Sequence, residues 1–243
     1  MNKNQPSRHL LLFGCAGWLL AAILLAGLAS PGLRHRLAAR FSHTQPDGNA
    51  VINARKAELQ IPWKDTRPLI IIAGDSHVEL GDWYELFHGT CAIRNCGLSG
   101  ARIPDVADLV SAIGDSSPEK VVLLCGINDL GAGTSVDTSV AAYRQLISST
   151  QASLHPKQII ALSVMPLTQK HIDLNRRVAD FNRGLQKTCE EQQVQFLDVT
   201  AAVSGQTGAL AEDLTGDGLH LNHQGYLKLA ARLEPVLRMA APH

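Results

Sequence analysis

The chain has 243 residues, 45% of them hydrophobic, which suits one α/β domain with an N-terminal extension and makes a second full domain unexpected. Its 22 acidic and 22 basic residues balance, so the net charge supplies no field that would gather a polyanion, and nucleic-acid binding is not expected. The sequence shows no repeat of about 20–50 residues and no long low-complexity tract, which argues against a solenoid or a disordered scaffold.

The first candidate element is an uncharged apolar run, LLLFGCAGWLLAAILLAGLA, at residues 10–29. As a helix it is long enough to cross a hydrocarbon core of about 30 Å. Small residues near its end resemble a signal-peptidase site, but the run exceeds the usual length of a secretory h-region. We therefore expect a basic segment at 1–9 and a transmembrane signal anchor at 10–30, with cleavage of the leader as the alternative.

Basic residues also follow the run, at Arg34, Arg36 and Arg40, so the positive-inside rule does not decide its orientation. The leader is similar to exported signal anchors, which predicts a single pass through the inner (cytoplasmic) membrane with the remaining domain on the periplasmic or extracytoplasmic side. Cys15 lies too early in the run for a lipoprotein cleavage site and is interpreted as a membrane residue. Residues 42–65 lack sustained periodicity, and residues 31–65 are predicted to be a linker between the membrane and the domain.

Short apolar runs and longer helix-like stretches alternate through residues 66–243. The runs are bounded by turn residues and lie at 69–73, 91–94, 121–125, 159–164 and 194–199. They are apolar throughout, which is typical of parallel strands covered on both faces. Residues 66–243 are therefore predicted to form a three-layer α/β/α sandwich around a parallel, flavodoxin-like sheet of about five strands, with the ligand site at the carboxyl ends of the strands.

Between the later runs, apolar residues recur at helical spacing. One stretch carries Val140, Tyr143, Leu146, Ile147 and Leu154, and the next carries Leu174, Val178, Phe181, Leu185 and Cys189. A last helix is expected to begin after the N-cap Asn222 and to be kinked or ended by Pro235. Its expected buried residues are Tyr226, Leu229, Ala230 and Leu233.

Four cysteines lie within this domain, at positions 91, 96, 125 and 189. They form no CxxC pair and no zinc pattern with histidine, so neither a metal site nor another cofactor is expected. We interpret them as buried core residues, although pairing in an oxidising compartment stays open.

Four short polar segments carry residues suited to nucleophilic catalysis. They are GDSH at 74–77, NCGLSG at 95–100, GIND at 126–129 and DGLH at 217–220. Each alone has an ordinary explanation as a turn or helix cap. Three of them follow predicted strands, where an α/β sheet gathers its active site, and independent coincidence does not explain all four in one chain.

The residue types indicate separate roles in acyl transfer. Ser76 follows an apolar strand at a small-residue turn, which is the position of an exposed nucleophile. Gly100 can bring a backbone N–H to a substrate oxygen and Asn128 can supply an amide donor, so both are candidates for an oxyanion hole. Asp217 precedes His220 on a glycine-containing loop, where a carboxylate can orient an imidazole that acts as general base. His223 is the nearest alternative base.

These segments resemble those of the SGNH (GDSL) hydrolase family over about residues 68–239. The resemblance implies that Ser76, Asp217 and His220 form a catalytic triad. It also implies that the oxyanion hole consists of the backbone N–H groups of Ser76 and Gly100 together with the side chain of Asn128.

The resemblance extends to neighbouring residues. It implies structural roles for Asp75 and Asp129, and Asn95 fits the family's usual Asn-x-Gly turn. Two residues depart from the family pattern: Arg102 stands near a position where many members carry a small hydroxyl residue, and His77 replaces the leucine common after the nucleophile. The histidine variant is similar to SGNH members that act on acetylated polysaccharides.

The family resemblance implies a carboxylic ester hydrolase that works through an acyl-serine intermediate. Combined with the predicted export, it predicts a short acyl ester, an O-acetyl group, on a cell-envelope or extracellular polysaccharide as substrate. Because the same triad serves polysaccharide O-acetyltransferases, lysophospholipases and thioesterases, these activities remain alternatives.

Two further interpretations lie outside serine chemistry. Asp75 and His77 also fit the D-x-H motif of binuclear metallophosphoesterases, but the segment at 126–129 lacks the partner histidine of that class. The other is a catalytically silent glycan-binding module. The sequence does not predict the oligomeric state.

Overall fold

The computed structural model describes residues 48–65, 67–87 and 91–238. The predicted anchor at 10–30 lies outside these ranges, and within them no helix has both the length and the apolar character needed to cross a bilayer. The chain divides into two compact units, Met1–Val51 and Ile52–His243. The second unit holds the sheet and all helices from α4 onward.

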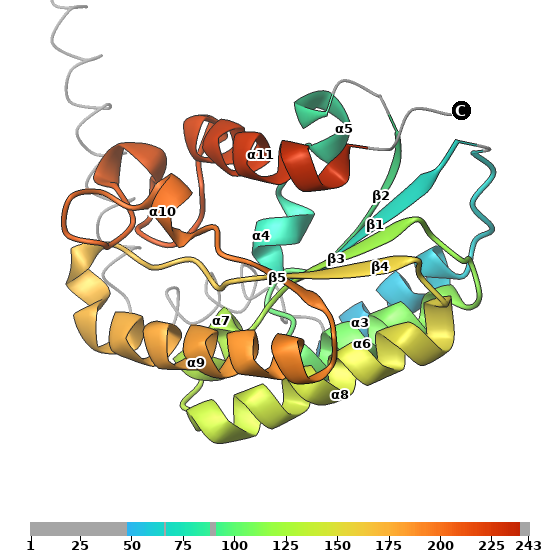
Figure 1. Cartoon of the computed structure of the whole chain (residues 1–243), viewed down its shortest axis with the longest axis horizontal. Helices are drawn as coiled ribbons and strands as arrows, with labels where there is room; N and C mark the ends of the chain where they lie inside the picture. Colours follow the sequence, from blue (N-terminus) through green and yellow to red (C-terminus); the bar gives the residue numbers. More distant parts are fainter. Residues whose placement is uncertain (1–47, 66, 88–90, 239–243) are drawn as a thin grey trace, which may run out of the picture. The chain divides into compact units, whose positions relative to one another are not determined.

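A parallel sheet of five strands forms the centre of this unit (Figure 1). The strands are β1 (Leu69–Gly74), β2 (Ala92–Gly97), β3 (Lys120–Leu124), β4 (Gln158–Leu162) and β5 (Gln195–Leu197). They lie in the order β2-β1-β3-β4-β5. Because the chain order changes direction between β1 and β3, their carboxyl ends flank the switch point at which such sheets bind ligands. The predicted α/β fold with a parallel five-stranded sheet is confirmed.

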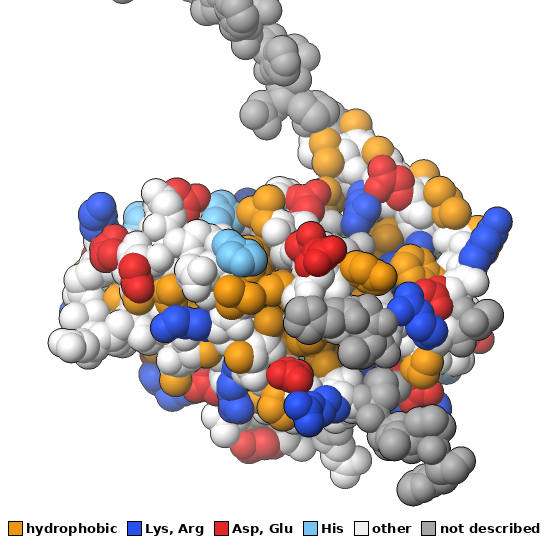
Figure 2. All heavy atoms as spheres, turned by 90° about the horizontal axis from the view of Figure 1, so that it is seen from above, with side chains coloured by type: hydrophobic (Ala, Val, Ile, Leu, Met, Phe, Trp, Pro, Cys, Tyr) orange, Lys and Arg blue, Asp and Glu red, His pale blue; other side chains and the backbone are white. Residues whose placement is uncertain are grey.

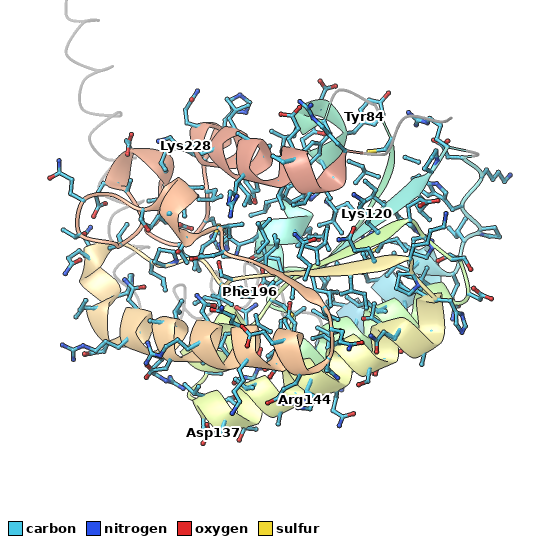
Figure 3. All side chains as sticks on the ribbon, in the orientation of Figure 1. Tyr84, Lys120, Asp137, Arg144, Phe196 and Lys228 are labelled. Carbon is cyan, nitrogen blue, oxygen red and sulfur yellow. The ribbon has the colours of Figure 1, made fainter. Side chains whose placement is uncertain are left out.

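Helices cover both faces of the sheet (Figure 1). One face carries α5 (Trp83–Leu86), α10 (Thr200–Val203) and α11 (His223–Leu237), and the other carries α6 (Ile103–Ile113), α8 (Val136–Leu154) and α9 (Ile172–Glu191). Asp137 and Arg144 on α8 and Lys228 on α11 mark the two outer layers in Figure 3. The predicted helical stretches thus become α8, α9 and α11.

Two short helices follow central strands, α4 (Ser76–Glu79) after β1 and α7 (Ile127–Gly131) after β3. Two 3₁₀ turns, η1 (Gln169–His171) and η2 (Glu212–Leu214), lie in the later connections. These short elements bring polar segments to the carboxyl ends of the strands.

The core has one apolar layer on each face of the sheet, because successive strand residues point to opposite sides. Ile70 and Ile72 of β1 belong to the cluster that includes Leu229 and Leu233 of α11. On the other face, the buried Tyr143 hydroxyl donates to the carbonyl of Leu123 at 3.0 Å. The sheet is therefore a rigid base for the loops at its edge.

The surface on the α11 side carries both signs of charge, in agreement with the equal numbers of acidic and basic residues in the chain. Seen from above, lysine and arginine intermingle with aspartate and glutamate over this face, and no extended patch of one sign is visible (Figure 2). The view therefore gives no electrostatic reason to expect a polyanionic partner on this face.

The structure contradicts the predicted linker over part of its length, because Gly48–Leu59 form a helix, α3. Leu59 is buried, Arg55 donates to the carbonyl of Asn95 at 2.8 Å, and Lys56 forms an ion pair with Asp108 at 2.6 Å. Leu59 is the one fully buried side chain of α3, so the sequence lacks the apolar stripe from which helices are predicted.

The last helix begins as predicted, with the side chain of Asn222 accepting the N–H of Gly225 at 3.1 Å. Pro235 was predicted to kink or end this helix. It does not end it, because α11 continues to Leu237. So close to the helix end the missing proline N–H removes only one hydrogen bond, and the buried side chains of Leu233 and Leu237 hold the last turn against the core.

The predicted core role of the cysteines agrees with the structure, since all four are buried. Cys96, Cys125 and Cys189 are free thiols. Burial raises the pKa of the Cys96 thiol to about 12, so this thiol stays protonated and unreactive at neutral pH.

Candidate active site

The nucleophile turn joins β1 to α4. β1 ends at Gly74 and α4 begins at Ser76, with Asp75 as its N-cap. The Asp75 carboxylate is buried and accepts the backbone N–H of His77 at 3.0 Å, which satisfies one of the free amides at the helix start. Because β1 lies between β2 and β3, Ser76 stands at the carboxyl edge of the sheet beside the switch point between β1 and β3.

Ser76, His220 and Asp217 are brought together from distant parts of the sequence. Ser76 Oγ lies 2.9 Å from His220 Nε2, and His220 Nδ1 lies 2.6 Å from Asp217 Oδ2. Since Nδ1 faces a carboxylate, it carries the proton of the neutral ring, and the Nε2 lone pair is directed at the serine hydroxyl. In this geometry the imidazole can take the serine proton.

The loop that carries Asp217 is closed by hydrogen bonds of its own. Asp217 Oδ1 accepts the backbone N–H of Leu219 at 2.9 Å and that of His220 at 2.8 Å. The pKa of the Asp217 carboxyl lies below its ordinary value, mainly because of the hydrogen bond from the His220 ring. The two backbone donors lower this pKa further. The carboxylate is therefore ionised at neutral pH and fixes the tautomer of His220.

The triad is open to solvent on the side of its base. The side chains of His220 and Asp217 are 31% and 55% exposed, whereas Ser76 is 6% exposed. The most exposed part of the triad is therefore the His220 loop.

The predicted oxyanion donors lie at the carboxyl ends of neighbouring strands. Gly100 follows β2 with a φ of +78°, a conformation that glycine adopts without strain. Asn128 follows β3, and its Nδ2 donates to the carbonyl of Ala101 at 2.9 Å. This bond holds the amide beside Gly100 and leaves its second N–H for a ligand. Within the described ranges, the backbone N–H groups of Ser76 and Gly100 have no protein acceptor.

Asn95 and Asp129 tie the loops of the site to one another. The Asp129 carboxylate accepts the N–H of Ile103 at 3.0 Å, which links α7 to the start of α6. The Asn95 amide donates to the carbonyl of Val78 at 2.9 Å, which links β2 to α4. Burial raises the pKa of the Asp129 carboxyl despite its backbone donors. These contacts agree with the structural role predicted for Asp129.

The contacts of His77 are the part of the site that the sequence does not predict. The side chain is buried, with Nδ1 3.2 Å from Asp75 Oδ1 and Nε2 3.1 Å from the carbonyl oxygen of Leu219. Both ring nitrogens are thus engaged within the protein, and neither offers a lone pair to a metal ion. This geometry argues against the metallophosphoesterase interpretation of Asp75 and His77.

Comparison with known proteins identifies the family. The model of the GDSL-like lipase/acylhydrolase family matches residues 71–228. The chain belongs to this family. This GDSL hydrolase is 28% identical over 182 residues to platelet-activating factor acetylhydrolase IB subunit alpha2 from Rattus norvegicus and from Homo sapiens, which covers 72% of the chain and 78% of each relative.

Solved structures share the fold of this GDSL hydrolase. A Streptococcus pneumonia protein named for platelet activating factor superposes with a TM-score of 0.71 at 24% identity, over 86% of this chain and 100% of the other. An acetylxylan esterase from Geobacillus stearothermophilus, solved as a catalytic mutant, superposes with a TM-score of 0.57 at 20% identity. The superposition covers 73% of this chain and 97% of the esterase. Membership of the family makes the chain a carboxylic ester hydrolase that acts on an acyl ester, as predicted.

Proposed function

We propose that the chain is a serine esterase that removes a short acyl group, an O-acetyl group, from a cell-envelope or extracellular polysaccharide. The observation that supports the serine chemistry is the continuous chain of contacts from the Ser76 hydroxyl through the His220 ring to the Asp217 carboxylate, at 2.9 Å and 2.6 Å. A serine hydroxyl is a poor nucleophile until a base takes its proton, and this chain of contacts supplies that base.

In the first half of the proposed reaction, Ser76 Oγ attacks the ester carbonyl carbon while its proton passes to His220 Nε2. The carbonyl electron pair moves to oxygen, and the resulting oxyanion receives hydrogen bonds from the N–H groups of Ser76 and Gly100 and from the Asn128 amide. The Asp217 carboxylate stabilises the imidazolium. Collapse breaks the bond to the alcohol oxygen, which takes the proton from His220 and leaves an acyl-Ser76.

In the second half, a water molecule attacks the acyl carbon and gives its proton to His220 Nε2. The second tetrahedral intermediate uses the same oxyanion donors and expels Ser76 Oγ, which recovers its proton. The products are a carboxylic acid and the free alcohol, and the enzyme returns to its starting state.

Three observations support an acetyl ester on a polymer. The curated relatives are acetylhydrolases by name, and an acetylxylan esterase has the same fold. The His220 and Asp217 side chains are 31% and 55% exposed, so a bulky chain on the alcohol side can approach the triad. The apolar leader, proposed here as an anchor in the inner membrane with the domain outside the cytoplasm, would place the enzyme next to envelope glycans.

The test uses the full-length protein purified in detergent. We expect it to hydrolyse p-nitrophenyl acetate faster than butyrate or octanoate esters, to release acetate from acetylated xylan, and to be labelled by a fluorophosphonate at Ser76. Ser76→Ala should abolish hydrolysis and labelling. Metal-dependent hydrolysis that survives Ser76→Ala would overturn the proposal. Transfer of acetyl to an added oligosaccharide faster than to water would instead make the enzyme an O-acetyltransferase.

A further inference from the structure

A second aspartate–histidine pair, Asp75 and His77, lies beside the triad and is used by no step of the proposed reaction. The two residues flank Ser76 in the sequence. His77 is 3% exposed, and its ring centroid lies 5.5 Å from that of His220. A buried imidazole so close to the catalytic base needs a physical explanation, because ionisable side chains are rarely buried without a defined partner.

The protonation of His77 follows from its two acceptors. Nδ1 lies 3.2 Å from a carboxylate oxygen of Asp75 and Nε2 lies 3.1 Å from the carbonyl oxygen of Leu219. A neutral imidazole has only one N–H, so both contacts are hydrogen bonds only when the ring is an imidazolium. The same Asp75 oxygen accepts the backbone N–H of His77 at 3.0 Å, so it is the acceptor for both the ring and the backbone of this residue.

The cationic form is favoured by its surroundings. Burial by itself lowers the pKa of His77, but the Asp75 carboxylate and the Leu219 carbonyl outweigh it, and the pKa is raised above 6.5. The titratable groups near the ring come from three elements: Asp75 in its own turn, Asp217 and His220 in the catalytic loop, and Tyr226 on α11. The Cys125 thiol at the end of β3 stays protonated, because burial raises its pKa.

The two partners of His77 adjoin the two reacting side chains. Asp75 directly precedes Ser76, and Leu219 directly precedes His220. The His77 backbone is fixed in turn, since the Tyr226 hydroxyl donates to its carbonyl at 2.9 Å. His77 therefore joins the nucleophile turn to the loop of the base through hydrogen bonds that do not involve the triad itself.

We propose that His77 is a positioning residue: as an imidazolium it holds the Leu219 carbonyl and so keeps Nε2 of His220 within reach of the Ser76 hydroxyl. This proposal rests on the proposed function, because it concerns the Ser76–His220 proton transfer. It also predicts a pH dependence. Below about pH 6.5 the contribution of His77 is complete, and it is lost as the pH rises through the raised pKa of the folded state, because one of the two hydrogen bonds is then lost.

The kinetic test compares His77→Leu and His77→Gln in the full-length protein. Leucine cannot donate to Leu219, and we expect kcat for p-nitrophenyl acetate to fall about 10- to 100-fold with little change in KM, as is typical of a misplaced base. The glutamine amide can donate to the Leu219 carbonyl but does not titrate. His77→Gln should therefore recover part of kcat and lose the decline of kcat with rising pH that we expect of the wild type.

A matched control is His223→Gln, because His223 is exposed and, within the part of the chain that the structure describes, its side chain forms no hydrogen bond or ion pair with a triad residue. It should keep the wild-type kcat and pH profile. Thermal unfolding of all variants separates misfolding from mispositioning. If His77→Leu has the kcat of the wild type, or if His77→Gln keeps the alkaline decline, the proposal is wrong.

A second measurement is independent of catalysis. In Ser76→Ala protein labelled with ¹⁵N-histidine, both ring nitrogens of His77 should carry a proton at pH 6, with the signals assigned by their loss in Ser76→Ala/His77→Gln. A single protonated nitrogen at pH 6 would overturn the proposal. Hydrolysis that persists in Ser76→Ala would overturn the proposed function instead, so the two failures are distinguishable.

Discussion

Replacing Asn128 with alanine tests the oxyanion hole most directly. The Asn128 amide follows β3, is held by the Ala101 carbonyl at 2.9 Å, and has one N–H left for a substrate oxygen. Two backbone N–H groups, those of Ser76 and Gly100, remain when it is removed. Asn128→Ala therefore deletes one of three proposed donors and leaves the triad untouched.

The expected fall in kcat follows from the stage of the reaction at which the hydrogen bond from Asn128 becomes strong, which is the formation of the oxyanion. Loss of one oxyanion donor costs about 2.7–4 kcal/mol of transition-state stabilisation, which is a fall of roughly 100- to 1,000-fold in kcat. KM should change little, because the ground-state carbonyl gains less from the donor than the oxyanion does. The partly buried hydrogen bond to the Ala101 carbonyl is also lost, which should lower the free energy of unfolding by about 1 kcal/mol.

The assay is steady-state hydrolysis of p-nitrophenyl acetate, with urea unfolding measured on the same preparations. Asn182→Ala is a matched control, because the Asn182 amide also holds a backbone segment, accepting from Val164 N and donating to Val164 O at 2.8 Å each. The control should lose similar stability and keep kcat. A kcat of Asn128→Ala close to that of the wild type would refute the assignment, and equal losses in both variants would show that only the loop geometry matters.

Three further predictions separate chemistry from stability. Asp217→Asn should lower kcat by about 10⁴-fold by favouring the wrong His220 tautomer. Because the pKa of Asp217 is lowered from 3.8, the stability advantage of the wild type over this variant in urea unfolding should be full at neutral pH and shrink as the pH falls below 3.8; a constant difference would contradict this. Gly218→Ala should lower the free energy of unfolding by about 1–2 kcal/mol and also lower kcat. The reason is that Gly218 has a φ of +89° and that the added Cβ would lie 2.8 Å from Thr168 Oγ1. Unchanged activity and stability of this variant would contradict the prediction. Leu146→Ala, at a fully buried position, should cost about 2–5 kcal/mol in urea unfolding while the folded enzyme keeps its kcat; a lower kcat would show coupling between α8 and the site.

The three inner strands, β1, β3 and β4, could be predicted from the sequence, because both faces of the sheet are buried there and each of these strands is apolar after its first residue. The residues at which the strands begin and end could not be predicted. β2 was expected at 91–94 but continues to Gly97, because the polar side chain of Asn95 is satisfied by the carbonyls of the segment after Ser76. β5 was expected at 194–199 and spans only Gln195–Leu197. As an edge strand it pairs with β4 alone, and the apolar Val199 beyond its end is buried by packing and not by pairing.

The candidate site was predictable where residue type alone restricts the chemistry. The structure places Ser76, His220 and Asp217 in contact, as expected from their segments, and sets Asn128 beside Gly100. The link from His77 to Leu219 could not be predicted, because it uses a backbone carbonyl, and sequence carries no record of which carbonyl a buried histidine will meet. The helix α3 could not be predicted either, because polar contacts of Arg55 and Lys56, and not an apolar stripe, attach it to the domain.

The place of the catalytic loop in the fold explains why it needs such links. Ser76 follows β1, an inner strand of the sheet, whereas the loop comes after the edge strand β5 and must return past β4 and β3. It is held at single points, among them the N–H of Thr168 on the Gly218 carbonyl at 3.0 Å and His77 on the Leu219 carbonyl at 3.1 Å. A single hydrogen bond contributes only about 1 kcal/mol to folding, whereas the positioning role proposed for His77 makes the 2.9 Å contact of His220 with Ser76 depend on such a link. Changes at these links should therefore lower kcat more than stability, whereas changes in the core should do the reverse.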